Sequence, residues 1–394
     1  MTPELHGGTR NMRIALVGVG LIGGSVGLAA RERIDGVRVV GWDPNRRTLD
    51  TAISVGAIDE VAPTLEAAVA EADLVVVAAP MGILPDVLRQ VLKAAPEECA
   101  ITDVGSVKRP VLEAAAGDGR LVAGHPLAGS ESAGVQHARA DLFDGAIWYL
   151  VPHDRSHGTR FEQVHRIVSQ LGARPTTIDA LTHDRLMATV SHLPHVLANV
   201  LVEQVGEASG DDQSVPATGP SFRDVTRVAG ANPTLWAGIY AANGDALAGQ
   251  LDRVIERLTD VRDRIRAGED LKGWQADAAQ LRRRLVDEAL TGDALAELRT
   301  VVPNRPGAIA ELALACSKEG INIVDISVAP LPGGATGMVA LWCPLEQAPK
   351  ALALLADLGI EVIGGERLDD AQRARGAQSS LLDDAVATAG DAPA

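Results

Sequence analysis

The feature that most constrains this chain is a glycine-spaced hexapeptide, Gly-Val-Gly-Leu-Ile-Gly, at residues 18–23. It follows an apolar run of strand length, Met12–Val17, and precedes a helical stretch from Gly24 to Ile34. In such a motif the first glycine permits a tight turn, the second lets the backbone approach a ligand, and the third lets helix and strand pack closely. Between a strand and a helix, this spacing predicts a βαβ unit whose helix N-terminus binds phosphate.

A carboxylate about 20 residues after this motif is expected to bond the ribose hydroxyls of a dinucleotide. Asp43 stands there, at the end of the next strand-like run. It would repel a 2′-phosphate, so the pattern favours NAD over NADP, although Arg46 and Arg47 leave residual NADP use open. A glycine turn in a fold that binds no nucleotide is the alternative. The predicted cofactor-binding residues are Gly18, Gly20, Leu21, Ile22, Gly23 and Asp43, with Ala79 and Pro80 at the end of a later strand.

The chain changes character three times, which predicts an α/β protein with several domains. Residues 11–178 alternate apolar strands with alanine-rich helices, the pattern of a parallel, doubly wound Rossmann-type sheet. Residues 179–295 show helical periodicity alone, and 296–368 read as βαββαβ, typical of a ferredoxin-like sandwich. The polar, alanine-rich tail 369–394 is expected to be disordered.

Composition limits the partners. The net charge is −16, which argues against nucleic acid or an anionic membrane, and no apolar run reaches the roughly 20 residues of a membrane span. The N-terminus lacks the apolar core of a signal peptide, and three scattered cysteines fit a reducing compartment, so we expect a cytoplasmic protein. An anionic substrate would then need a local cluster of positive charge.

One histidine stands out on a loop of small residues. His125, in the stretch AGHPLAGSES, ends an expected strand and is followed by Pro126. A neutral imidazole, with a pKa of about 6.5, suits the acceptance of a hydroxyl proton near neutral pH. Ser106 ends the neighbouring strand and either caps a helix or directs its hydroxyl at that imidazole.

The helical region carries a second set of candidates. In SHLPH, His192 and His195 are three residues apart on one helix face, but no third ligand has suitable spacing, so we expect no metal. In FRDVTR, Arg223 and Arg227 share a helix face, where guanidinium groups either bind carboxylates or form ordinary salt bridges.

Taken together, HPLAGSESAG, SHLPH and FRDVTRVAGANPTLW resemble the prephenate dehydrogenase family. The segment 298–367, with NRPGAIAEL and GINIVDIS, resembles an ACT domain, an amino-acid-sensing module. The resemblance implies NAD-dependent oxidation and decarboxylation of prephenate to 4-hydroxyphenylpyruvate, in tyrosine biosynthesis. It also implies a homodimer that assembles through the helical domain.

The resemblance also assigns roles. His125 would be the general base, and Ser106 would hydrogen-bond both that histidine and the substrate hydroxyl. Glu131 would gate the site, His195 and Arg227 would bind the substrate side chain and carboxylate, and Trp236 would pack nearby. Tyrosine or phenylalanine would bind the ACT domain near Asn304, Gly307 and Asn322.

Several alternatives stay open. Arogenate dehydrogenases carry the same motifs and accept an amino acid in place of the keto acid, and Asp224 does not separate the two. Hydroxyacid dehydrogenases and pyrroline-carboxylate-type reductases also join a Rossmann domain to helices, without these three motifs together. A non-catalytic NAD-binding amino-acid sensor is a more distant reading, and the ACT domain could serve dimerisation alone.

Overall fold

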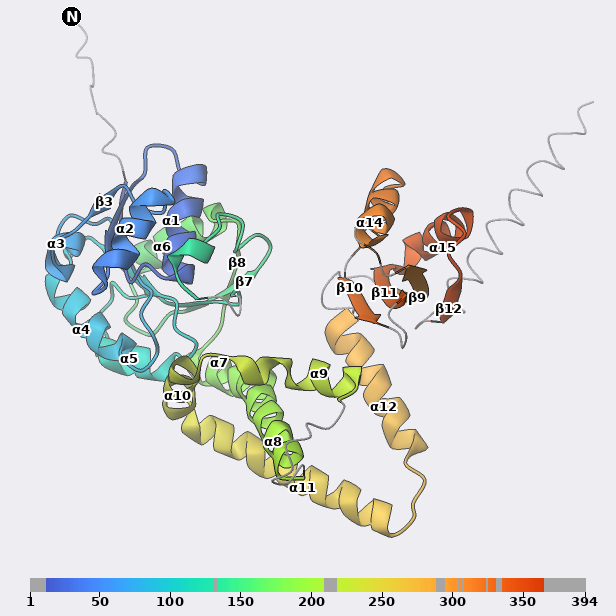
Figure 1. Ribbon diagram of the computed structural model, residues 1–394. Coiled ribbons are helices and arrows are strands. Elements are labelled where there is room, and N and C mark those ends of the chain that lie inside the picture. Colours follow the sequence, from blue (N-terminus) through green and yellow to red (C-terminus); the bar gives the residue numbers. More distant parts are fainter. Residues whose placement is uncertain are drawn as a thin grey trace, which may run out of the picture. The chain divides into compact units, whose positions relative to one another are not determined.

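The computed structural model describes most of the chain in two compact units, divided between Thr259 and Asp260 (Figure 1). The described residues are 12–129, 133–208, 218–287, 295–303, 305, 308–323, 325–330 and 335–364. The predicted disordered tail, 369–394, lies outside them. No helix in these ranges is both long enough and apolar enough to cross a membrane.

A five-stranded parallel sheet forms the first part of unit one, in the order β3-β2-β1-β4-β5. Successive residues of β1 point to opposite faces, so Ile14 and Leu16 enter one apolar core and Ala15 and Val17 the other. Burial on both faces explains the continuous apolar runs of the sequence and confirms the doubly wound sheet. The elements are β1 (Arg13–Val17), α1 (Leu21–Arg33), β2 (Arg38–Trp42), α2 (Arg46–Ser54), β3 (Glu60–Val61), α3 (Leu65–Val69), β4 (Leu74–Val77), α4 (Leu84–Ala94), β5 (Ala100–Asp103) and α5 (Arg109–Ala115).

The last strands before residue 178 continue from β5 through an isolated parallel bridge between Ile101 and Leu121, but they do not complete the single parallel sheet predicted. They form a separate three-stranded sheet in which β6 and β7 are antiparallel and β7 and β8 parallel. A parallel neighbour needs a crossover, usually a helix, and the described part of the β6–β7 connection holds only a 3-10 turn, η1. The elements are β6 (Ala123–Pro126), η1 (Val135–His137), β7 (Ile147–Val151), α6 (Gly158–Gln170) and β8 (Arg174–Thr177).

Helices alone follow β8 in the described part of unit one, as predicted. They are α7 (Ala180–Met187), η2 (Ala188–His192), α8 (Leu193–Ala208), α9 (Pro220–Thr226), η3 (Arg227–Gly230), α10 (Pro233–Ala242) and α11 (Gly244–Arg266), which crosses the division between units. The η2 segment is a π-helix, closed by a bond from the Leu193 N–H to the Ala188 carbonyl. Pro194, next in the chain, has no N–H to continue α-helical pairing, which favours this local widening.

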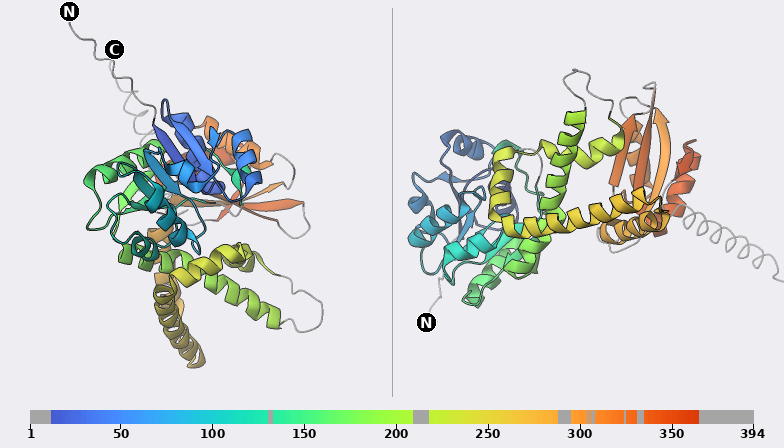
Figure 2. Two further views of the ribbon diagram at one scale, coloured as in Figure 1. Left: turned by 90° about the vertical axis from the view of Figure 1, so that its left-hand side faces the viewer. Right: turned by 90° about the horizontal axis from the view of Figure 1, so that it is seen from below.

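Unit two contains a four-stranded antiparallel sheet in the order β10-β11-β9-β12. Figure 2 shows the ribbon of this sheet and its helices from two further sides. Helices α14 and α15 contribute Leu312, Cys316 and Leu355 to one core with the sheet residues Leu298 and Leu341. This βαββαβ arrangement confirms the predicted ferredoxin-like sandwich. The elements are α12 (Lys272–Arg282), η4 (Arg283–Asp287), β9 (Leu295–Pro303), α14 (Ala308–Lys318), β10 (Asp325–Pro330), β11 (Thr336–Pro344), η5 (Leu345–Gln347), α15 (Ala348–Asp357) and β12 (Val362–Gly364).

A buried lysine joins the two sheets of unit one. The Lys108 ammonium donates to Asp103 Oδ2 at 2.5 Å and to the Gly124 carbonyl at 2.6 Å, with both charged side chains fully buried. Asp103 ends β5 and Gly124 lies in β6, so this contact fixes the edge at which both strands finish. Burial lowers the pKa of Lys108, and the adjacent Asp103 carboxylate opposes that shift.

Replacing Lys108 with Met should therefore destabilise unit one strongly, because it leaves the Asp103 carboxylate buried without its cation. We expect a loss of about 3–5 kcal/mol in the free energy of unfolding, measured by urea denaturation followed by circular dichroism. The double variant Lys108→Met/Asp103→Asn should lose clearly less than the sum of the two single changes. Additive losses would show that the pair is not coupled.

Candidate active site

The predicted glycine motif forms the turn between β1 and α1. Gly18 has a φ of +93°, and a side chain there would meet the Ala78 carbonyl oxygen at 2.4 Å. A Cβ on Gly23 would lie 2.1 Å from the Gly18 carbonyl oxygen. By contrast, a Cβ on Gly20 would meet no atom within 4 Å. Two glycines thus allow close packing, and the third leaves open space over the backbone.

That open space faces the start of α1, whose first residues are Leu21 and Ile22. Gly20 is the N-cap and supplies no side-chain hydrogen bond, so the first backbone N–H groups of the helix have no side-chain cap. Unpaired N–H groups and the helix dipole attract an anion such as a pyrophosphate. The motif therefore has the geometry that a dinucleotide requires.

Asp43 lies directly after β2, on the same side of the turn. Its Oδ2 accepts the Val19 N–H at 3.1 Å and its Oδ1 accepts the Asn45 N–H at 2.9 Å. These bonds hold the carboxylate beside the glycine turn, where it can accept hydrogen bonds from the ribose hydroxyls. Arg46, the source of doubt about NADP, pairs with Asp50 at 3.1 Å on the surface.

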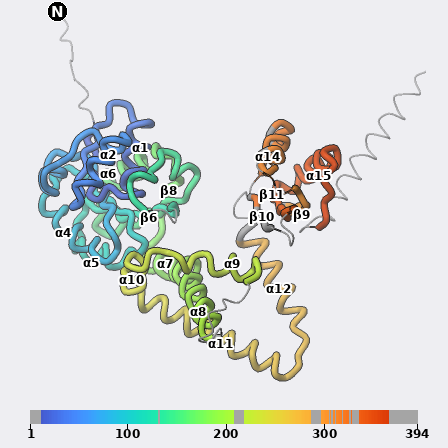
Figure 3. The backbone as a smooth tube through the Cα atoms, in the orientation of Figure 1, coloured from blue at the N-terminus to red at the C-terminus, as the bar shows by residue number. Residues whose placement is uncertain are grey.

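Ala79 and Pro80 follow β4 and begin a loop that helix α10 approaches. A Cβ on Gly238 of α10 would lie 3.0 Å from the Gly82 backbone nitrogen, and Trp236 packs against the same core as Ala79. The end of α10, whose backbone is traced in Figure 3, contacts α7, because the Asn243 amide donates to the Asp184 carbonyl oxygen. Trp236, a predicted substrate residue, therefore lies on the helix that meets the predicted cofactor loop.

His125 lies in β6 at the same edge of unit one and is 9% exposed. Its Nδ1 is 2.9 Å from Nε2 of His183 in α7, whose Nδ1 is 2.9 Å from Asp184 Oδ1. The two imidazole rings meet edge to face, with 5.1 Å between their centroids. Burial, and then the positive charge of Lys108, hold the pKa of His125 well below its usual 6.5. The ring is therefore neutral at pH 7, as a general base must be.

Ser106 is half-buried in the β5–α5 connection, but the hydrogen bond predicted between it and His125 is not formed. In the described chain, His125 Nδ1 is bonded to His183. Glu131, the predicted gate, lies outside the described residues.

His195 stacks on Trp236, with ring centroids 3.5 Å apart and planes 24° from parallel. His192 meets the same indole edge to face, and its Nδ1 lies 3.2 Å from Asn243 Nδ2. Burial lowers the pKa of His195 and lowers that of His192 to about 4. These two histidines are therefore neutral polar groups at pH 7 and add no positive charge.

Arg227, the predicted carboxylate ligand, begins η3 and is exposed. Arg223 is exposed one helical turn earlier in α9, and α9 and η3 pack against α8, which carries His195. The predicted substrate residues thus come from neighbouring helices of unit one.

Three functional candidates were missed in the sequence: His183, Asp184 and Asn243. The Asn243 amide donates to the Asp184 carbonyl oxygen at 2.8 Å. The only available signal was an adjacent His-Asp pair near a predicted helix start, and nothing in its spacing connects it to His125.

The predicted effector residues are only partly described. Asn304 and Gly307 lie outside the described residues. Asn322 is exposed, and its backbone N–H donates to Gln347 Oε1 at 2.7 Å. A search of the described residues finds no cluster of three or more His, Cys, Asp or Glu side chains that could hold a metal.

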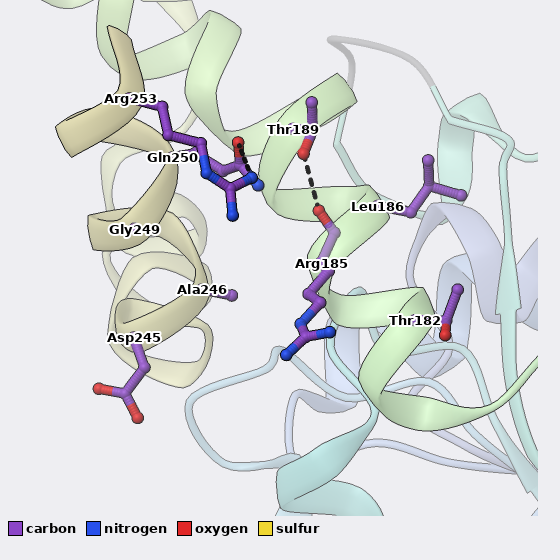
Figure 4. A pocket seen from close by; sticks show the side chains of 9 residues that line it. All are labelled: Thr182, Arg185, Leu186, Thr189, Asp245, Ala246, Gly249, Gln250 and Arg253. Carbon is purple, nitrogen blue, oxygen red and sulfur yellow. Dashed lines mark hydrogen bonds between the residues drawn. The ribbon is translucent and has the colours of Figure 1, made fainter. Parts of the chain in front are cut away.

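A cavity of about 660 Å³ lies between α7 and α11 (Figure 4). The cavity residues Thr182, Arg185, Leu186 and Thr189 are three or four positions apart and so share one face of the helix. His183 and Asp184 do not line the cavity. None of the predicted site residues lines it, so the cavity is separate from the histidine cluster. Its lining is Thr182, Arg185, Leu186, Thr189, Asp245, Ala246, Gly249, Gln250 and Arg253.

Models of known protein families match three successive parts of the chain. Residues 26–177 match the nucleotide-binding domain model of prephenate dehydrogenase, 179–289 its dimerization domain, and 296–359 the ACT domain. A prephenate dehydrogenase of Bacillus subtilis is 31% identical over 325 residues, covering 80% of this chain and 87% of that protein. This chain belongs to the prephenate dehydrogenase family.

Two further proteins are similar to most of this chain. A cyclohexadienyl dehydrogenase of Zymomonas mobilis is 32% identical over 64% of this chain and 88% of its own length. The crystal structure of prephenate dehydrogenase from A. aeolicus, in complex with hydroxyphenyl propionate and NAD+, has a TM-score of 0.66 and 25% identity. It covers 71% of this chain and 100% of its own.

Two glycines of the motif should respond differently to substitution. Gly20→Val should raise the Kd for NAD at least tenfold with little change in Tm, because its side chain fills only the open space above the turn. Gly23→Val should instead lower the Tm, because its side chain collides with the Gly18 carbonyl. Isothermal titration and thermal unfolding separate the two effects. An unchanged NAD affinity in Gly20→Val would contradict this placement of the pyrophosphate.

Proposed function

We propose that this protein oxidises and decarboxylates prephenate, with NAD as hydride acceptor, to give 4-hydroxyphenylpyruvate. The observation that carries the proposal is a buried, neutral His125 next to Gly124, whose carbonyl accepts from Lys108 beside the end of β5. The glycine turn and Asp43 follow β1 and β2, which end at the same carboxyl edge of the parallel sheet as β5. A base and a dinucleotide site on one edge suit the oxidation of an alcohol.

The chain's own part in this reaction is to remove one proton and to orient the substrate. His125 takes the ring hydroxyl proton, with Ser106 near the same strand end to hydrogen-bond the hydroxyl oxygen. The glycine turn and Asp43 would hold NAD, which would supply the hydride acceptor for the ring carbon that bears this hydroxyl. Loss of the ring carboxylate as carbon dioxide produces an aromatic ring, so the protein need not supply a strong acid.

Prephenate is a dianion, and we propose that a few side chains of the helical region bind it. In an acidic protein with neutral His192 and His195, Arg227 is the cation proposed to bind a substrate carboxylate, through a bidentate pair. His195 supplies a neutral hydrogen bond to the side chain, and the Trp236 indole, stacked on it, forms an apolar wall. Glu131 is the proposed gate.

Arogenate is the second candidate substrate, since it differs only in carrying an amine where prephenate has a keto group. We also propose a homodimer formed through the helical domain, and regulation by tyrosine or phenylalanine at the ACT domain, near Asn304, Gly307 and Asn322. The domain limits proposed are 11–178, 179–295 and 296–368. Effector binding without any turnover would instead favour the non-catalytic sensor.

His125→Asn tests the base directly. We expect kcat for NADH formation from prephenate to fall by about 10²–10⁴-fold, the usual contribution of a general base. The Kd for NAD should stay within a factor of about two, because the substitution leaves the glycine turn intact. Normal turnover in a folded His125→Asn protein would refute the catalytic assignment, and thermal unfolding shows whether the variant is folded.

The pH dependence of kcat/KM gives a second test. A base must be neutral, and the pKa of His125 is held well below 6.5 by burial and Lys108. Activity should therefore persist as the pH falls through about 6.5, and should decline only at lower pH, where His125 takes up a proton in the free enzyme. An acidic limb centred near 6.5 would show an unperturbed histidine and contradict the geometry.

A further inference from the structure

We propose that His183 and Asp184 are positioning residues for His125: they fix the tautomer of its ring and stabilise the positive charge that it acquires. The inference rests on the proposed function and extends it to two side chains beyond the residues assigned above.

The three groups form one buried chain of hydrogen bonds. His125 Nδ1 and His183 Nε2 are 2.9 Å apart, and His183 Nδ1 and Asp184 Oδ1 are also 2.9 Å apart. His183 and Asp184 are fully buried and His125 is nearly so, which excludes water as a competing partner at these atoms. Every step in the chain is therefore a direct hydrogen bond.

The order of donors follows from the carboxylate. Ionised Asp184 can only accept, so His183 carries its proton on Nδ1. His183 Nε2 is then an acceptor, and His125 must donate to it from Nδ1. This leaves His125 Nε2 unprotonated, which is the nitrogen that can receive the substrate proton. The chain thus selects the one tautomer that makes His125 a base.

Asp184 is itself held ionised and in place. It accepts the backbone N–H groups of Lys108 at 2.7 Å and Arg109 at 3.0 Å, and the Arg109 Nε at 3.3 Å. Burial raises the pKa of Asp184, but the bonds from His183 and from those two backbone groups outweigh it and leave the pKa lowered. The carboxylate also lies at the N-terminus of α5, where the helix dipole favours negative charge.

Charge balance explains why the carboxylate matters during reaction. As the hydroxyl O–H bond breaks, its proton forms a bond to His125 Nε2 and the ring becomes an imidazolium. The cation Lys108 opposes that charge, and Asp103 already pairs with Lys108. Asp184 is then the carboxylate linked to the ring, through His183. The titratable groups that face this pair are Asp103, Lys108, Arg109, Tyr149 and His192.

Four variants on α7 test the proposal. His183→Phe removes the acceptor and should lower kcat by about 10²–10⁴-fold, with KM and the Kd for NAD nearly unchanged. His183→Gln can still accept from His125 and donate to Asp184, so it should recover part of that loss. Asp184→Asn should lower kcat and move the acidic limb of kcat/KM to lower pH, because imidazolium loses its carboxylate. Arg185→Gln, on the opposite face of α7, is the matched control and should keep wild-type kinetics.

The tautomers of His125 and His183 can be determined without measuring turnover. Long-range ¹H–¹⁵N spectra of the full chain, labelled at histidine, should show His125 and His183 both protonated on Nδ1 in the wild type. In His183→Phe, the Nε2-protonated form of His125 should appear. Folding of each variant is checked by its thermal unfolding.

Two results would overturn the proposal: wild-type kcat in folded His183→Phe, or His125 protonated on Nε2 in the wild-type spectrum. A wild-type protein silent with both prephenate and arogenate would instead refute the proposed function. The spectra would then still decide whether His183 sets the tautomer.

Discussion

The buried carboxylate of Asp184 is the contact on which the rest of unit one depends. It accepts two backbone N–H groups at the start of α5, and so ties α7 to the sheet that carries the glycine turn. The carboxylate is linked to His125 by hydrogen bonds through His183. The backbone carbonyl oxygen of Asp184 accepts a hydrogen bond from the Asn243 side-chain amide. One residue thereby fixes the helical region against the sheet and the imidazole within it. Stability and chemistry share this contact, so substitutions here need a readout beyond activity.

Electrostatics in the site follow from burial more than from the charge of the whole protein. The net charge is −16, yet burial keeps His125 and His192 neutral by lowering their pKa values, which leaves their nitrogens available to accept protons or donate hydrogen bonds. The positive charge of Lys108 lowers the pKa of His125 further. Positive charge for an anionic substrate then has to come from arginine, which cannot lose its proton in this way.

Local patterns predicted much of this molecule. The spacing of Gly18, Gly20 and Gly23 requires only neighbouring residues, as does the βαββαβ order of the last domain, and both are confirmed as elements of the fold. The antiparallel pairing of β6 with β7 depends on which edge the chain returns to, which apolar runs do not encode. His183 was missed for a related reason: it is 58 residues from His125, and only tertiary packing brings the two rings together. The glutamate at 131 lies outside the described residues, so its role stays a prediction.

The most direct measurement of the central claim is NADH formation by the wild-type protein, with prephenate and arogenate offered separately and carbon dioxide release followed in parallel. We expect prephenate alone to support turnover, with one carbon dioxide released for each NADH formed. Turnover of arogenate alone would keep the chemistry and change the substrate. NADH without carbon dioxide, or no turnover of either compound, would refute the proposed oxidative decarboxylation.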